Sequence, residues 1–228
     1  SPGLPMKVSQ LSAETGVPLP TIKMYLRKGL LQPGDKTEPN QAEYGEEHAR
    51  RLRLIHGLLH VGGLSIATAR KVLDAAGSDL PLINVLGVAQ RAATDAVDDS
   101  HVSPHAQATV DELVGTWGGG ADPRDPGRTL AATAIDAFEQ AGQRDASAWY
   151  ERYAALALLI AEADLDLLDA SEGSAAKAET VVLGTVLGDT LLAGLRRSAQ
   201  WHLSEQRYLT PESTRPPSSD SPQNASRS

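Results

Sequence analysis

The segment PLPTIKMYLRKGLLQPG, residues 18 to 34, decides how the first part of the chain folds. Pro18 and Pro20 fit only the first turn of a helix, because the backbone N–H groups there have no intrahelical acceptor. Gly29 can end such a helix in a left-handed conformation. The segment therefore predicts a short helix over residues 18–28.

This helix has two different faces at 100° per residue. Its apolar side holds Leu19, Ile22 and Leu26. Its other side holds Lys23, Met24, Arg27 and Lys28, with Tyr25 at the edge. We therefore expect the apolar side to pack inward and the basic side to face solvent.

The preceding segment, MKVSQLSAETGV (6–17), predicts another short helix with Ser9 as its cap and Leu11 inward, ended by Gly16. Two short helices around a glycine turn form the helix-turn-helix pattern, whose second helix can enter a major groove. A solvated lysine-rich face on an ordinary helix explains this segment equally well.

The residues that follow favour the DNA-binding alternative. Residues 30–44 are rich in turn formers and predict two short extended pieces joined by a turn, which is a wing. A helix over residues 46–60 carries Arg50, Arg51 and Arg53 beside an apolar stripe. Ser65 then caps a further helix over 65–76, so that a second helix-turn-helix follows the wing.

The order of these pieces over residues 6–75 resembles the N-terminal DNA-binding domain of the MerR family of bacterial transcription regulators. The family pattern T-I-R-Y-Y-E is matched by Thr21, Ile22 and Tyr25. Its arginine, first tyrosine and glutamate are replaced by Lys23, Met24 and Leu26. In the wing pattern G-Y-R-x-Y, Tyr44 matches the last tyrosine and Asn40 stands in place of the glycine. Ala42 stands in place of the arginine, and Lys36 is the nearest basic residue that could replace its phosphate contact. Lysine is a point charge, so contacts at Lys23 should be less geometrically selective than those of an arginine.

The resemblance implies a homodimer on a pseudo-palindromic promoter site that bends and untwists DNA and so acts on RNA polymerase indirectly. The DNA-contacting residues it implies are Thr21, Lys23, Tyr25, Arg27, Lys28, Lys36, Tyr44, Arg50 and Arg51. The tyrosine hydroxyls would contact phosphate, which positions a protein without reading sequence. The protein is expected in the cytoplasm, associated with the nucleoid.

Charge and composition agree with a DNA-binding role for the first part of the chain alone. The net charge is −8, but residues 1–75 carry 10 Lys+Arg against 7 Asp+Glu (+3), and residues 76–228 carry 11 against 22 (−11). Only the first part is therefore expected to meet a polyanion. The absence of cysteine excludes disulfides and thiolate metal sites. We find no apolar run of the roughly 20 residues that span a bilayer, no signal peptide, and no enzyme motif.

The predicted fold class is mainly α, with a winged helix-turn-helix domain (6–76), a linker helix (80–100), a C-terminal α-helical bundle (101–209) and a disordered tail (210–228). The linker helix has a possible dimer seam at spacings of four and three, formed by Leu82, Leu86, Ala89, Ala93 and Ala96. An equal alternative is one more amphipathic helix of the domain, in which case the C-terminal domain would hold the dimer.

Four helices are predicted in the C-terminal part, at about 102–117, 127–142, 146–170 and 176–203. Most of the chain's aromatic residues lie there. An organic effector would use Trp117, Trp149, Tyr153 and Trp201, although ordinary core packing is the more common role of such residues. A constitutive repressor or architectural protein without a ligand remains the alternative function.

Two histidine pairs at i, i+4 spacing, His56 with His60 and His101 with His105, have the spacing of metal ligands. Neither pair has a clear carboxylate partner, and the metal and redox branches of the family use cysteines that this chain lacks. We therefore predict no metal, no cofactor, no enzymatic activity and no membrane partner.

Overall fold

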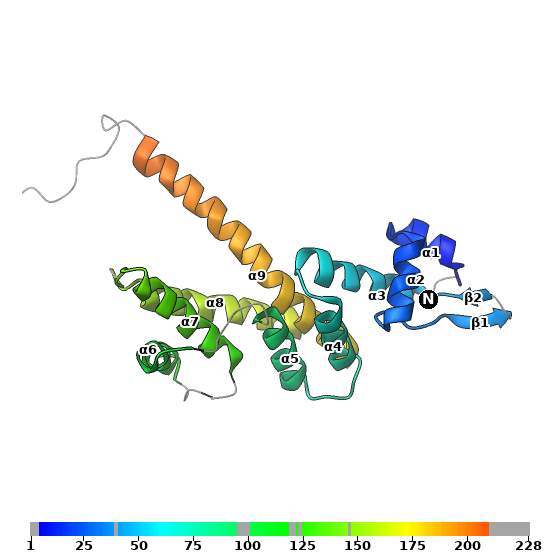
Figure 1. Ribbon diagram of the computed structural model, residues 1–228, viewed down its shortest axis with the longest axis horizontal. Coiled ribbons are helices and arrows are strands. Elements are labelled where there is room, and N and C mark those ends of the chain that lie inside the picture. Colours follow the sequence, from blue (N-terminus) through cyan, green and yellow to red (C-terminus); the bar gives the residue numbers. More distant parts are fainter. Residues whose placement is uncertain are drawn as a thin grey trace, which may run out of the picture. The chain divides into compact units, whose positions relative to one another are not determined.

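A computed structural model describes residues 5–38, 41–94, 101–118, 122, 125–145 and 147–209 (Figure 1). The chain is mainly helical, as predicted, and it divides into two compact units, residues 1–188 and 189–228. The predictions for Asn40, for Ala96 and for the tail 210–228 lie outside the described residues.

The helix-turn-helix and the wing are present. The elements in chain order are α1 (Val8–Thr15), α2 (Leu19–Lys28), β1 (Asp35–Glu38), β2 (Gln41–Glu43), α3 (Glu46–His56), the π-helical turn η1 (Gly57–Val61) and α4 (Ile66–Ala76). Strands β1 and β2 pair antiparallel, which confirms the wing. A further bridge joins Met6 to Tyr44 and so ties the wing to the start of the chain.

The ends of these helices follow the local chemistry. Gly29 has φ +74° and its N–H donates to the Leu26 carbonyl at 3.2 Å, so the predicted left-handed end of α2 is confirmed. The Ser65 hydroxyl accepts from the Thr68 N–H at 3.1 Å, as expected for an N-cap. The prediction for Ser9 is wrong, because α1 already begins at Val8 with Lys7 as its N-cap.

One hydrophobic cluster joins the N-terminal elements to α5 (Leu82–Thr94) and to the first half of α9 (Ser174–Ser204). It contains Leu11, Ile22, Leu52, Ile55, Leu58 and Leu73, and it also takes in Val181, Val182 and Val186 from α9. The first half of α9 is therefore part of the core that supports the helix-turn-helix.

Helix α5 (Leu82–Thr94) belongs to the same cluster. Val85 and Ala89 are buried, and Leu82 and Leu86 pack against the cluster. Leu82, Leu86 and Ala89 of the predicted seam thus contact the chain's own core, as the alternative of one more amphipathic helix of the domain expects. The dimer seam itself stays a prediction.

The four predicted C-terminal helices are α6 (Pro104–Gly115), α7 (Pro126–Gln140), α8 (Trp149–Asp169) and α9. A second, smaller cluster joins α6, α7 and the first turn of α8 through Ala106, Val110, Ala132, Ile135 and Tyr150. The buried carboxylate of Asp136 on α7 accepts from both the N–H and the hydroxyl of Ser103, each at 2.6 Å, and so fastens the start of α6. The four helices do not share a single core.

The last helical stretch of the described chain is long and strongly apolar. By length and composition alone, the stretch Ser174–Leu209 is sufficient to cross a membrane, with a mean hydropathy of 1.4 over a window that is 22% buried. The expectation that no segment qualifies was therefore wrong. Because Ala178, Val181, Val182 and Val186 are buried in the N-terminal cluster, the first half of this helix serves as a core helix.

Candidate nucleic-acid interface

The outer face of α2 is the most concentrated basic surface among the predicted site residues. Lys23, Arg27 and Lys28 are all exposed, while Ile22 is fully buried and Tyr25 is 2% exposed. Arg27 and Lys28 also lie in the last turn, where positive charge favours the helix dipole. The buried residues hold the helix in place, and the basic residues are free to meet a polyanion.

Both tyrosines of the predicted site are core residues, which corrects their expected exposure. Tyr25 is 2% and Tyr44 is 7% exposed, and burial raises the pKa of the Tyr25 hydroxyl. The Tyr44 ring meets the His48 ring edge to face at 5.1 Å, and its backbone exchanges two 2.8 Å hydrogen bonds with Met6. Both side chains are therefore mostly enclosed by the domain.

Arg51 is likewise engaged inside the domain. Its Nε donates to the Leu30 carbonyl at 3.0 Å and its Nη1 donates to the Leu73 carbonyl at 3.4 Å. Burial lowers the pKa of this guanidinium, opposed by the charges of Asp74 and Glu179. The side chain thus connects the segment after α2 to α4, and its predicted phosphate contact stays a prediction.

Other basic residues border the α2 face. Lys36 on β1 is exposed and lies directly opposite Ala42 in the strand register, next to the position where the family pattern has arginine. Arg50 on α3 is exposed. Sequence reasoning missed Arg70, an exposed α4 residue whose Cδ lies 3.9 Å from the place that a β-carbon on Gly29 would take. The sequence did contain a signal for the exposure of Arg70. Arg70 lies two residues before the buried Val72, and two residues along a helix turn the side chain to the opposite side.

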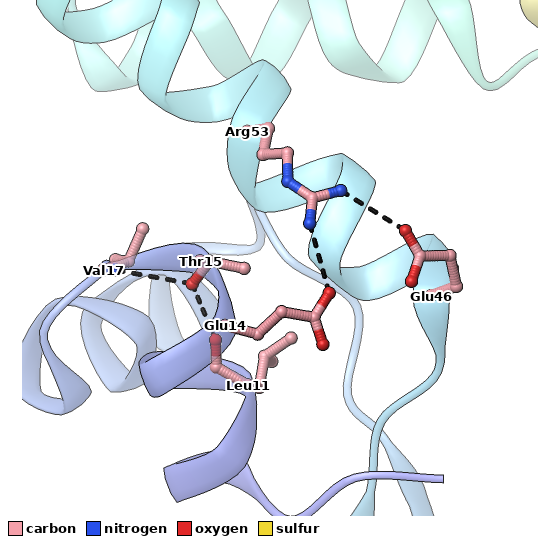
Figure 2. A network of polar contacts seen from close by, with 6 residues as sticks. All are labelled: Leu11, Glu14, Thr15, Val17, Glu46 and Arg53. Carbon is pink, nitrogen blue, oxygen red and sulfur yellow. Dashed lines mark hydrogen bonds and ion pairs between the residues drawn. The ribbon is translucent and has the colours of Figure 1, made fainter. Parts of the chain in front are cut away.

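An ion-pair bridge holds the turn of the helix-turn-helix against α3 (Figure 2). Arg53 donates to Glu14 of α1 at 3.1 Å and to Glu46 of α3 at 3.3 Å. On α1, the Thr15 hydroxyl donates to the Leu11 carbonyl at 2.7 Å and accepts from the Val17 N–H at 3.4 Å. The charge of Arg53 is therefore paired with two carboxylates of its own domain, one of them on α1.

A hollow of about 800 Å³ lies beside this turn. Its lining includes Thr21 and Tyr25 of α2 and the paired rings of His56 and His60, whose centroids are 4.7 Å apart. Thr21 is half-buried and so lies at the edge of the α2 face. Within the described ranges, no group of three or more His, Asp or Glu side chains gathers in the geometry of a metal site.

The predicted effector residues are only partly brought together. Trp149 contacts Tyr153 with ring centroids 4.6 Å apart, and it also contacts Phe138 at 5.1 Å. Trp117 is 41% exposed in the turn after α6. Trp201 is 71% exposed and belongs to the second unit.

The Tyr150 hydroxyl is buried beside this aromatic cluster and has no hydrogen-bond partner among the described residues. Its pKa is raised by burial, and the charges of Glu139 and Asp145 act in the same direction. The Tyr150 ring contacts Phe138 at 6.0 Å and Trp149 at 5.6 Å. The cluster of Phe138, Trp149, Tyr150 and Tyr153 is therefore apolar with one unsatisfied polar atom.

Comparisons with known proteins agree with this geometry. A sequence model of the family described as "MerR HTH family regulatory protein" matches residues 6–76. A crystal structure of a candidate transcriptional regulator from Streptomyces coelicolor A3(2), SCO5550, is 32% identical, covers 90% of this chain and 99% of that chain, and superposes with a TM-score of 0.67. No curated protein matches the chain. The basic helix-turn-helix, its wing and this near full-length likeness together show that the chain belongs to the MerR family of DNA-binding transcription regulators, which are not enzymes.

Proposed function

We propose that the protein is a homodimeric MerR-type regulator that binds a pseudo-palindromic promoter site, distorts the DNA, and responds to an organic effector. The observation that carries the DNA contact is the outer face of α2, where Lys23, Arg27 and Lys28 are exposed above buried Ile22 and Tyr25. A helix with this division can lie in a major groove without disturbing its own packing.

The proposed contact surface extends beyond α2. It comprises Thr21, Lys23, Arg27, Lys28, Lys36, Arg50 and Arg70. The wing residue Lys36 and the α3 and α4 arginines would bind phosphates, which fixes the register of α2 on the duplex. Promoter distortion would act on RNA polymerase indirectly, and such a protein would associate with the nucleoid.

The DNA contact is tested by fluorescence anisotropy with a labelled duplex over a range of salt concentrations. A triple variant K23A/R27A/K28A should bind at least about tenfold more weakly. Because the proposed homodimer loses six positive charges, the slope of log affinity against log salt should become shallower by up to about five. The matched control R196A/R197A/R207A removes three positive charges from the C-terminal part. An equal loss in the control would contradict the proposed surface.

The effector proposal is supported by the aromatic cluster around Trp149. Ligand sites are mostly apolar with a few polar groups, and the cluster offers Phe138, Trp149 and Tyr153 together with the unsatisfied Tyr150 hydroxyl. A thermal-shift screen of small organic molecules tests it, since a ligand that binds the native state raises the apparent stability. A hit should lose its effect in W149A, provided that the variant still folds. Retention of the full shift in W149A would exclude this location.

A further inference from the structure

The hollow beside the turn of the helix-turn-helix is formed entirely by elements of the DNA-binding domain. Its walls come from the turn after α1, from α2, from the end of α3 with η1, and from the start of α4, all within residues 15–66. Its volume of about 800 Å³ is in the range of sites for small organic molecules, about 300–1,000 Å³. The hollow is therefore large enough to hold a ligand of its own.

Tyr25 contributes a buried polar group to this hollow. Its side chain lines the hollow although only 2% of its surface is exposed. Among the described residues, none forms a hydrogen bond with its hydroxyl, and the hydroxyl oxygen is not sealed off as that of Tyr150 is. A buried hydroxyl costs stability unless it is hydrogen-bonded. A molecule in the hollow can accept a hydrogen bond from it.

Three further side chains offer hydrogen bonds at the same hollow. Thr21, His56 and His60 line it. The two imidazole rings contact each other, and within the described ranges no residue forms a hydrogen bond with either ring or with the Thr21 hydroxyl. His60 lies on the π-helical turn η1, and such turns are rare and often occur at functional sites. Together with Tyr25, these side chains have hydrogen-bonding capacity that the described residues leave unused.

The electrostatics of the hollow favour an anion. Within the part of the chain that the structure describes, no Asp or Glu side chain lines it. The N-cap residues Pro18 of α2 and Ser65 of α4 do line it, so the positive ends of two helix dipoles lie at its wall. Arg53 also lines the hollow, but its charge is paired with Glu14 and Glu46 (Figure 2). A carboxylate suits this environment, because it accepts hydrogen bonds and donates none.

Much of the remaining wall is apolar. Its aliphatic side chains come from the turn after α1, from α2, from η1 and from the start of α4, and they are Val17, Met24, Leu59, Leu64 and Ile66. An apolar molecule that covers them removes hydrocarbon surface from water. A mostly apolar wall with a few polar groups is typical of sites for small organic molecules.

We propose that this hollow is a ligand site for a small organic acid with an apolar body. The Tyr25 hydroxyl and the His56–His60 pair donate hydrogen bonds to the carboxylate, and the apolar body packs against the aliphatic wall. The site goes beyond the proposed function, because the effector site proposed there lies at Trp149 and the DNA contact uses the outer face of α2.

A ligand in this hollow would also act on DNA binding. Thr21 lines the hollow and belongs to the proposed DNA surface. A carboxylate bound there would lie near the DNA phosphates, and like charges repel. The acid should therefore weaken DNA binding, and by linkage DNA should weaken the binding of the acid by the same factor. This effect on DNA, unlike the ligand site itself, rests on the proposed function.

The site is tested by calorimetric titration of the full chain, without DNA, with 1-naphthoate and octanoate. Tyr25→Phe should weaken the binding of either acid by about tenfold or more, because it removes a hydrogen bond to a charged group. Tyr44→Phe is the matched control, since Tyr44 is 7% exposed in the same domain and lies outside the lining of the hollow. The neutral 1-naphthamide should bind more weakly than the acid.

Failure of both acids to bind at millimolar concentration would overturn the proposal. Equal losses in Tyr25→Phe and Tyr44→Phe would overturn it as well. Binding that W149A abolishes and Tyr25→Phe leaves unchanged would place the acid in the aromatic cluster and so contradict the site in the hollow.

The location is read independently from the imidazole C–H signals in NMR spectra, which the variants H56Q and H60Q assign. The acid should shift the signals of His56 and His60. It should leave those of His101 and His105 unchanged, because this second pair of the same spacing lies outside the hollow. Shifts confined to the second pair would overturn the location, and the readout does not depend on any variant of Tyr25.

Fluorescence anisotropy with a labelled duplex measures the effect on DNA. Saturating 1-naphthoate should weaken duplex binding by about tenfold. Acid binding with unchanged duplex affinity would contradict this competition and leave the ligand site in place. Acid binding by a chain that binds no duplex would contradict the proposed function, and it would again support the ligand site.

Discussion

Val186 of α9 lies so close to Gly62, at the end of η1, that its Cγ1 leaves no room for a β-carbon on Gly62. Gly62 has φ −75°, which any residue adopts, so the glycine is required by packing and not by its backbone. Val186 is 3% exposed. The first half of α9 is thus closely packed against η1, which supports the helix-turn-helix.

Gly62→Ala should lower the free energy of unfolding by about 1–3 kcal/mol, the usual cost of overpacking. Gly184→Ala is the control, since nothing lies within 4 Å of its added methyl group and alanine favours a helix. Chemical denaturation measures both. If the close approach is responsible, combining Gly62→Ala with Val186→Ala should cost less than the sum of the two single changes. Simple additivity would contradict this explanation.

Arg50 and Arg51 are neighbours with opposite expected roles. Arg51→Ala should cost about 1.5–3 kcal/mol of stability, because it removes hydrogen bonds from a charged donor to two backbone carbonyls. Arg50→Ala should leave stability within about 0.5 kcal/mol and weaken DNA binding, since Arg50 is exposed. Thermal melts and anisotropy on the same proteins separate the two effects. Equal stability losses would contradict the assignment.

Helix α2 shows which structural features can be predicted from the sequence. Its prolines, its final glycine and its alternation of apolar and basic residues were sufficient to predict the helix and its exposed Lys23 and Arg27. The same local rules placed Tyr25 at the edge, but the neighbouring helices cover it to 2% exposure. Burial of that kind depends on contacts between segments far apart in the chain, which periodicity does not describe.

The same limit is seen when α5 is compared with α8. Both have apolar residues at heptad spacing, and the spacing alone does not tell which stripe faces the chain's own core. The structure assigns Leu82 and Leu86 to that core and leaves Leu156 and Leu167 exposed. The exposed fractions of these residues, and not their spacing, distinguish the two helices.

Tyr150→Phe should leave the protein as stable as the natural chain or slightly more stable. The buried hydroxyl has no hydrogen-bond partner among the described residues, so its removal eliminates a desolvation cost and breaks no bond. A thermal melt checks this directly. A clear loss of stability would mean that the hydroxyl has a partner in solution, and Tyr150→Leu, which also removes the ring, separates loss of packing from loss of the hydroxyl.

Asp136 makes stability depend on pH in the acid range. The hydroxyl and N–H of Ser103 lower the pKa of its carboxyl group, against the opposing effect of burial, and the charge of His105 acts in the same direction as Ser103. A carboxyl group whose pKa is lower in the folded state stabilises the fold fully above its unfolded value, about 3.9, and loses this contribution as pH falls through the folded value.

We therefore expect the melting temperature of the natural protein to change little through Asp136 between pH 7 and 5 and to fall below about pH 4. Asp136→Asn should show a smaller fall over the acid range, although it begins from a lower stability at pH 7. Asp111 titrates in the same direction, because Arg128 lowers its pKa, so part of the fall will remain. An acid profile in Asp136→Asn that runs parallel to that of the natural protein would show that the Ser103 contact does not govern this titration.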